Sequence, residues 1–351
     1  MTSTVPAPRD LSLPQWRPAS RGAFSLQHHT AAEPTIGYVR LSITRGCSMR
    51  CTYCRPDFDR GHDPAALDAD DYAFLIRHLH RRFGLRKVRI TGGEPTIRRD
   101  LPEIISAVRE AGVQDVAMTT NALTLARDAQ RLREAGLSRL NVSLDSLNAQ
   151  RFAALTGVDG LHRVLEGIEM AVQVGFDAIK LNTVVIAGQN ERDLPALLRF
   201  AAQRGLAIRF IELMPMGPLA DSWDHRYVSA ERMRAALRET VRSWECDATV
   251  PGARVSDAAR MWTAHLRNGD VARVGFITPM SQHFCDTCDR LRITAEGDIY
   301  PCLMDQPRGN LRDAVRFRDD DWVNREIATA YGQKRAVHPA VAPGIMTHIG
   351  G

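Results

Sequence analysis

From residue 38 to residue 213 the sequence alternates between short runs rich in β-branched residues and longer stretches with helical periodicity. This alternation restricts the fold more than any other feature, because it is typical of a parallel sheet with right-handed crossovers. The expected strands are Tyr38–Ile43, Lys87–Thr91, Val116–Thr120, Arg139–Leu144, Ile179–Val185 and Ile208–Leu213. The expected helices are Asp70–Phe83, Leu101–Ala111, Ala126–Ala135, Leu161–Val174 and Leu194–Arg204. Six strands fall short of the eight in a closed barrel. We therefore predict an α/β fold, a partial (β/α)6 barrel, in preference to a flat doubly wound sheet.

The chain divides into three predicted regions. Residues 1–35 are rich in Pro, Arg and Ser and lack periodicity, which predicts a flexible extension. Residues 36–214 form the partial barrel. In residues 215–351 the alternation stops, and strand-like runs occur at Ala272–Ile277, Leu291–Thr294 and Ile299–Leu303. We expect this last region to be a C-terminal cap domain that a metal centre helps to hold together.

Composition narrows the class of protein. The 351 residues are 44% hydrophobic and 25% charged, as in ordinary globular domains, and the net charge of +5 is spread along the chain. No apolar run is long enough for a membrane span or a secretory signal. We expect a cytoplasmic protein that binds neither nucleic acid nor a membrane. Disulfides are rare in the cytosol, so clustered cysteines there indicate a metal site or catalysis.

Each expected strand has one apolar and one polar face. Arg40 lies on the polar face of the first strand, Arg89 on that of the second and Lys180 on that of the fifth. In a barrel the apolar faces pack against the helices, so the polar faces line the lumen. A filled barrel would carry branched apolar residues there instead. A basic lumen therefore predicts a cavity for an anionic ligand, and the alternative is a solvent-exposed sheet face.

The first cysteine group is Cys47, Cys51 and Cys54, directly after the first strand. Three thiolates in eight residues can hold a [4Fe–4S] cluster and leave one iron without a protein ligand. Ligands of parallel-strand folds sit beyond the carboxyl ends of the strands, which is where this group lies. A zinc site or a chance group of buried cysteines is the alternative.

The second group is Cys285 and Cys288, followed after thirteen residues by Cys302. With His283 as a fourth ligand it fits zinc as well as a second iron–sulfur cluster, and spacing alone leaves both open. Cys246 stands apart and is interpreted as a structural free thiol.

The second strand ends in Thr91-Gly92-Gly93-Glu94-Pro95. The glycines allow a close approach of the backbone, and Glu94 offers an acceptor for an ammonium group. A plain turn between strand and helix would explain the same residues.

These motifs together resemble a known family. The first cysteine group with Tyr53 before its last cysteine, and the Gly-Gly-Glu-Pro run, are similar to the radical S-adenosylmethionine (SAM) superfamily. The second cysteine group, the run from Asp289 to Arg292 and the terminal Gly350-Gly351 resemble the MoaA-type family of GTP 3′,8-cyclases over about residues 36–351. The resemblance implies two [4Fe–4S] clusters, SAM and GTP. It also implies abstraction of the 3′ hydrogen of GTP and cyclisation to (8S)-3′,8-cyclo-7,8-dihydroguanosine 5′-triphosphate, the first step of molybdenum cofactor (molybdopterin) biosynthesis.

The resemblance also assigns roles by position. The six cysteines of the two groups would hold the clusters. The SAM contacts would be Tyr53, Gly93, Ser143 and Met214. The GTP contacts would be Arg40, Arg89, Thr119, Lys180, Arg290 and Arg292, with Lys87 and Arg209 as weaker candidates for the triphosphate. No side chain is assigned as an acid or base. The terminal Gly-Gly would reach the active site.

The sequence departs from the family pattern at three positions: Asp289 replaces the usual Asn, Arg55 an apolar residue and Ala122 a Gly. None of these removes a ligand.

Other functions fit less well. A radical SAM peptide-modifying maturase usually has more C-terminal cysteines, and a two-cluster ferredoxin is short with four cysteines per cluster. A nucleotide-binding regulator would have a phosphate loop, which is absent. As partners we expect an electron donor, a downstream pterin synthase and a second copy of the chain in a homodimer.

Overall fold

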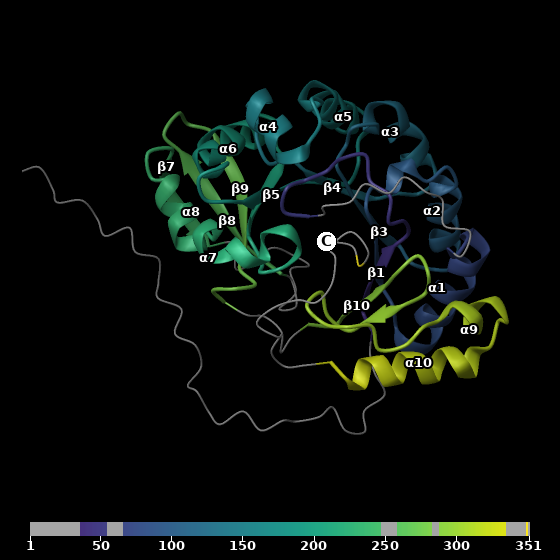
Figure 1. Cartoon of the computed structure of the whole chain (residues 1–351). Coiled ribbons are helices and arrows are strands. Elements are labelled where there is room, and N and C mark those ends of the chain that lie inside the picture. Colours follow the sequence, from purple (N-terminus) through teal and green to yellow (C-terminus); the bar gives the residue numbers. More distant parts are fainter. Residues whose placement is uncertain (1–35, 55–65, 247–257, 283–287, 335–348, 350–351) are drawn as a thin grey trace, which may run out of the picture. The chain divides into compact units, whose positions relative to one another are not determined.

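The computed structural model describes residues 36–54, 66–246, 258–282, 288–334 and 349 (Figure 1). The strands are β1 Tyr38–Ser42, β2 Lys87–Thr91, β3 Asp115–Thr120, β4 Arg139–Ser143, β5 Ala178–Val185, β6 Ala207–Glu212, β7 Val241–Cys246, β8 Ala259–Leu266, β9 Val271–Ile277, β10 Arg290–Ile293 and β11 Ile299–Tyr300. The α-helices are α1 Ala69–Phe83, α2 Leu101–Glu110, α3 Leu125–Glu134, α4 Ala149–Thr156, α5 Leu161–Val174, α6 Leu194–Gln203, α7 Trp223–Arg226, α8 Ala230–Ala236, α9 Arg312–Arg316 and α10 Asp320–Gly332. Short 3₁₀ turns span Pro95–Ile97, Glu191–Asp193 and Gly217–Ser222. None of the helices in the described ranges is long and apolar enough to cross a lipid bilayer.

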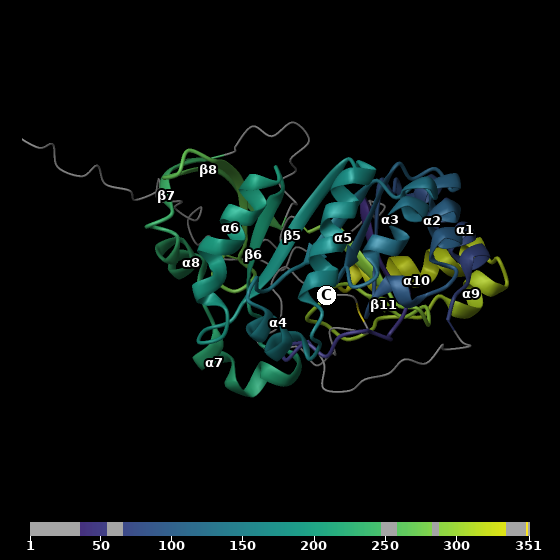
Figure 2. The ribbon, with the colours of Figure 1, turned by 90° about the horizontal axis from the view of Figure 1, so that it is seen from above.

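The predicted α/β fold is confirmed. Strands β1 to β6 pair in chain order and in parallel, and their bounds agree with the expected ones to within one residue. Figures 1 and 2 show α1, α2, α3, α5 and α6 following one another along one face of this sheet. Helix ends follow local rules, because Asp68 and Asp71 form a capping box at the start of α1 and Gly84 ends that helix in the left-handed conformation.

The sheet extends beyond the six expected strands. Its order is β11-β10-β1-β2-β3-β4-β5-β6-β9-β8-β7. β10 pairs in parallel with β1, and β9 pairs in parallel with β6, so the C-terminal region adds a parallel strand to each side of the barrel core. β11 and the hairpin of β7 and β8 continue the sheet in antiparallel pairing. The sheet therefore runs across the predicted domain division at residue 214, which remains a prediction.

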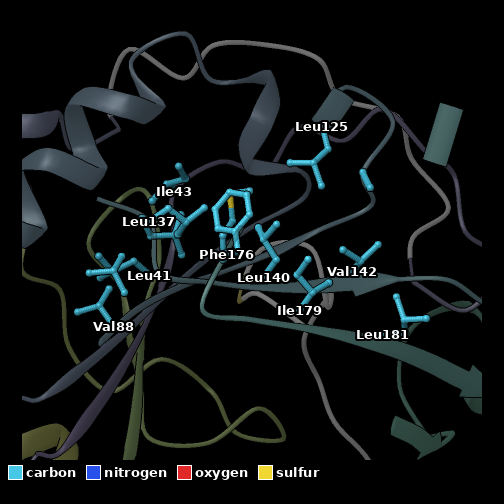
Figure 3. Close-up of a cluster of buried hydrophobic side chains, with 14 of the residues drawn as sticks. Leu41, Ile43, Val88, Leu125, Leu137, Leu140, Val142, Phe176, Ile179 and Leu181 are labelled. Carbon is cyan, nitrogen blue, oxygen red and sulfur yellow. The ribbon is translucent and has the colours of Figure 1, made fainter. Parts of the chain in front are cut away.

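The face of the sheet toward the helices carries the hydrophobic core. Leu41 of β1, Val88 of β2, Leu140 of β4 and Leu181 of β5 are completely buried there, and Figure 3 shows them spread across the sheet. Val323 of α10 belongs to the same buried cluster. Because alternate residues of a strand point to opposite faces, the residues between these apolar ones face the other side of the sheet. There the polar side chains gather.

Candidate active site

The first cysteine group lies in a loop after β1 that α4 holds in place. The amides of Arg50 and Thr52 donate to the carbonyls of Thr156 and Leu155 at the end of α4, at 2.8 and 2.9 Å, and Figure 2 shows the two segments side by side. The buried Met49 anchors the loop in the main core. Helix α4 was not among the helices expected from the sequence, although Asn148 caps its start and Gly157 ends it in the left-handed conformation. This short helix fixes where the first cysteines lie.

Cys47, Cys51 and Cys54 are half-buried and free of disulfides. Burial raises the pKa of the Cys51 thiol well above its ordinary value, and the neighbouring Cys54, Asp145 and Cys47 add to this effect. Among the described residues no three such side chains close around one point as a single metal ion requires. The fit to a larger iron–sulfur cluster therefore rests on the chemistry of the three cysteine donors. Three soft sulfur atoms that repel one another as thiolates suit a cationic iron–sulfur group.

The Gly-Gly pair at the end of β2 packs against the cysteine loop. The Gly93 amide donates to Thr44 O and the Glu94 amide to Gly46 O, both at 2.8 Å. A Cβ atom at Gly93 would lie 2.0 Å from Gly46 O, so only glycine allows this approach. The expected close approach of the backbone therefore involves the loop that carries the first cysteines.

The Glu94 carboxylate is buried and is used within the chain. Its Oε1 accepts from the Thr96 amide and from the hydroxyls of Thr96 and Thr120, and its Oε2 accepts from the Asn121 amide at 2.6 Å. Burial nevertheless raises the pKa of Glu94. Because both oxygens already have donors, this geometry favours a brace between the ends of β2 and β3 over the acceptor for an ammonium group that the sequence suggested.

The expected SAM residues lie around the carboxyl ends of the strands. Tyr53 and Met214 line the cavity described below, while Gly93 follows β2 and Ser143 ends β4. The Tyr53 hydroxyl donates to Asp145 Oδ2 at 2.7 Å in a buried contact. Asp145 Oδ1 accepts from the Val184 amide, and burial raises the pKa of Asp145 to about 6. Sequence reasoning missed Asp145, since nothing in its local pattern marks a partner 92 residues away.

One cavity brings together most of the expected GTP residues. Its lining includes Arg40, Arg89, Thr119, Arg290 and Arg292. The strand register explains why three of them meet, because Arg40 of β1 pairs with Arg292 of β10 on one side and with Arg89 of β2 on the other. Arg209 of β6 also lines the cavity.

Lys180 of β5, the remaining expected GTP residue, is not among the described residues that line the cavity. It is in register with Asn141 of β4 and is close enough to Arg209 and Arg89 to be repelled by their charges. Burial, with repulsion from Arg209, Arg139, Lys87 and Arg89, lowers its pKa to about 7.

The arginine side chains that line the cavity favour an anionic ligand. Burial lowers the pKa of Arg89 to about 9; the attraction of Tyr38 opposes this shift, and repulsion from Arg40, Arg209 and Arg290 adds to it. Arg89 Nε is buried without a hydrogen-bond partner in the part of the chain that the structure describes. Burial would raise the pKa of the Tyr38 phenol, but Arg40 and Arg89 together with Lys87 and Arg290 lower it to about 7. Such a group of cations is suited to a polyphosphate.

The second cysteine group is described in part. Cys288 and Cys302 are half-buried and line the same cavity, while Cys285 and His283 lie outside the described residues. Burial opposes ionisation of Cys288, but Arg290 and Lys334 outweigh it and lower the pKa of this thiol. Sequence reasoning missed Lys334, which lies 32 residues beyond Cys302 and outside any motif.

Three further expectations concern Cys246, the C-terminus and the departures from the family pattern. Cys246 is exposed in the edge strand β7. Ile349 is buried against Met216 and Met304, and its carbonyl accepts from Arg292 Nη1 at 3.0 Å.

The terminal Gly-Gly and Arg55 lie outside the described residues, and Asp289 is half-buried. Ala122 has a φ of 62°, in the left-handed region that favours glycine.

Comparisons with known proteins identify the family of the chain. Residues 41–201 match the family model of the radical SAM superfamily, and residues 206–340 match that of Molybdenum Cofactor Synthesis C. A GTP 3′,8-cyclase of Listeria monocytogenes is 40% identical over 284 residues, which are 80% of this chain and 83% of the relative. An enzyme of the same name from Klebsiella pneumoniae is 39% identical, and the match covers 86% of this chain and 90% of the relative. One from Heliobacterium modesticaldum is 37% identical, and the match covers 90% of this chain and 98% of the relative.

Among solved structures, Streptococcus suis SuiB bound to its precursor peptide SuiA has a TM-score of 0.58 at 16% identity. The likeness covers 86% of this chain and 68% of SuiB, and it concerns the fold alone. The identity to the relatives over most of both lengths shows that the chain belongs to the GTP 3′,8-cyclase family of the radical SAM superfamily.

Proposed function

We propose that this enzyme converts GTP into (8S)-3′,8-cyclo-7,8-dihydroguanosine 5′-triphosphate by radical SAM chemistry, as the first step of molybdenum cofactor biosynthesis. The observation that carries the proposal is the row of Arg292, Arg40 and Arg89 in one cavity with Tyr53 and Cys288. This cavity combines cations for a triphosphate with Cys288 and Cys302 of the second group and with Tyr53, which directly precedes Cys54 of the first group. Family membership and geometry thus support the same substrate.

The first cluster would be held by Cys47, Cys51 and Cys54. When bound, the cluster and SAM supply the one-electron chemistry that removes the 3′ hydrogen of GTP. The chain's own contribution is to position SAM. Tyr53, fixed by its hydrogen bond to Asp145, and Gly93, Ser143 and Met214 are the proposed contacts.

The triphosphate would lie against Arg40, Arg89 and Lys180, with Thr119 as a neutral contact. In the free protein the pKa values of Arg89 and Lys180 are lowered first by burial and further by repulsion from neighbouring cations. A bound polyanion relieves this repulsion and favours the protonated form of Lys180, while Arg89 is already charged at neutral pH. Charge complementarity of this kind also directs an anionic substrate into the cavity.

The guanine end would lie near the second cluster, which we assign to Cys285, Cys288 and Cys302. Zinc with His283 as the fourth ligand is the competing assignment. Arg290 and Arg292 flank this site and are the proposed GTP contacts from the C-terminal region. The cluster is favoured because relatives at about 40% identity over most of the chain carry the GTP 3′,8-cyclase name.

The reaction also requires partners. It consumes electrons, so an electron donor must supply them, and a pterin synthase is the proposed recipient of the product. The homodimer and the cytoplasmic location remain predictions. A peptide substrate is not favoured, because the SuiB likeness is one of fold at 16% identity.

The test is whether deoxyadenosine formation depends on GTP. The reconstituted enzyme is incubated anaerobically with SAM and a reductant, with and without GTP, and 5′-deoxyadenosine is measured. We expect formation coupled to loss of GTP. Formation that ignores GTP and increases with added peptide would refute the proposal in favour of a peptide-modifying enzyme.

A further inference from the structure

Lys334 bridges the two chain segments that carry cysteines of the second group. Its Nζ donates to the carbonyl of Arg290 at 2.7 Å and to the carbonyl of Pro301 at 2.8 Å. Arg290 follows Cys288 by two residues, and Pro301 directly precedes Cys302. One ammonium group therefore joins the backbone beside one cysteine to the backbone beside the other.

The bridge stands where the strand ladder stops. β10 and β11 pair at Ile293 with Ile299 and at Arg292 with Tyr300, and no further pair of these strands is formed among the described residues. Beyond that point, toward Cys288 and Cys302, the Lys334 ammonium group joins the two segments. Charge-assisted hydrogen bonds to two carbonyls can fix the separation of the segments there.

Lys334 is itself held by a well-anchored helix. It follows α10, and its amide donates to Tyr331 O at 3.0 Å. Val323 and Ile327 bury α10 in the main core. At the other end of the helix, His78 of α1 lies 2.7 Å from Asp320 Oδ1 and 2.9 Å from Asn324 Oδ1. The backbone that carries the Lys334 ammonium group is therefore anchored through α10 to the hydrophobic core.

We propose that Lys334 is a positioning residue of the second iron–sulfur cluster, and that it sets the distance between the segments of Cys288 and Cys302. The inference rests on the proposed function, because it takes these cysteines as cluster ligands. Lys334 contacts backbone carbonyls and is not a ligand. Residues that orient metal ligands in this way typically change metal retention by about 10- to 100-fold when they are replaced.

The test uses two full-length parent variants, each of which keeps a single cluster. One lacks the first group through Cys47→Ala, Cys51→Ala and Cys54→Ala, and the other lacks the second through Cys285→Ala, Cys288→Ala and Cys302→Ala. Lys334→Met is added to each parent, and the rate at which a ferrous chelator removes iron is followed after anaerobic reconstitution. We expect at least about tenfold faster release from the second cluster and an unchanged rate from the first.

Two controls separate positioning from general destabilisation. Gln333→Met changes the exposed neighbouring residue and should leave both rates unchanged. Lys334→Arg keeps a cationic donor and should restore slow release in part. Equal acceleration at both clusters, or the same effect from Gln333→Met, would overturn the inference. A parent without the first group that takes up zinc or no iron would instead overturn the assignment of the second cluster, and with it the inference.

Discussion

Replacing Arg89 with methionine should stabilise the GTP-free protein while it weakens GTP binding. Arg89 lines the cavity with its Nε buried and unpaired among the described residues, and Arg40 lies beside it in register on β1. The side chain is therefore unfavourable for folding and valuable for binding. Methionine keeps a similar unbranched stem and removes the charge.

The size of the effect follows from the lowered pKa. A depression from 12.5 to about 9 corresponds to about 5 kcal/mol of unfavourable free energy for the charged form. The folded pKa of this base is the lower one, so the penalty is fully present below pH 9 and disappears only as the pH approaches 12.5. Solvent screens part of this penalty because the Arg89 side chain is only half-buried, and the substitution also removes the contact of the guanidinium with the Tyr38 ring. We therefore expect a gain of about 1–4 kcal/mol at pH 7. Loss of a buried charge opposite a phosphate costs about 2–5 kcal/mol, which weakens GTP binding by at least about 30-fold.

The assay pairs denaturant unfolding without GTP with equilibrium dialysis of GTP and of SAM. Arg89→Met should unfold at higher denaturant concentration, bind GTP weakly and bind SAM as before. Arg131→Met on the exposed surface of α3 is the matched control and should change stability by less than about 0.5 kcal/mol. A lower unfolding midpoint for Arg89→Met, or equal losses of GTP and SAM binding, would refute the reasoning.

Three further predictions concern the brace, the backbone and the pH dependence. Glu94→Gln should lower the free energy of unfolding by about 1–3 kcal/mol, because an amide donor would face the Asn121 amide that now donates to Oε2; unchanged denaturant unfolding would contradict the brace. Ala122→Gly should raise the unfolding free energy by about 0.5–1 kcal/mol, since relief of the positive φ exceeds the entropy that glycine adds to the unfolded chain; a lower midpoint would show that the position is not strained. GTP affinity should fall as the pH rises through about 7, because Lys180 loses its proton and Tyr38 gains a negative charge there. Titration calorimetry at pH 6 and 8.5 measures this, and the double variant Lys180→Met with Tyr38→Phe should remove most of the dependence; an unaltered dependence in that variant would exclude these two groups.

The local parts of the fold could be predicted from the sequence. β1 to β6 and the five helices between them follow from periodicity and glycine ends, because those signals lie within each segment. The long-range parts could not. The pairing of β10 with β1 joins residues about 250 positions apart, and short strands such as β10 contain no signal that selects a partner. Helix α4 lay outside the expected pattern because it interrupts the simple alternation of strand and helix.

The candidate site shows the same division. Arg40 and Arg89 were expected on one face because strands alternate, and they do lie side by side. The motif of Glu94 suggested an acceptor for a ligand, whereas the donors that its oxygens meet, from Thr120 and Asn121, come from a distant segment that the motif does not reveal. No sequence motif marked Lys334 as part of the site, because its role depends on which backbone carbonyls lie near the end of α10.

The most direct test of the proposed reaction uses GTP that carries deuterium at C3′. The enzyme with both clusters, SAM and a reductant is incubated anaerobically, and the nucleoside and nucleotide products are examined by mass spectrometry. We expect deuterium to appear in 5′-deoxyadenosine and GTP to be replaced by an isomer with a bond between C3′ and C8. Unlabelled deoxyadenosine together with unchanged GTP would contradict the proposed reaction.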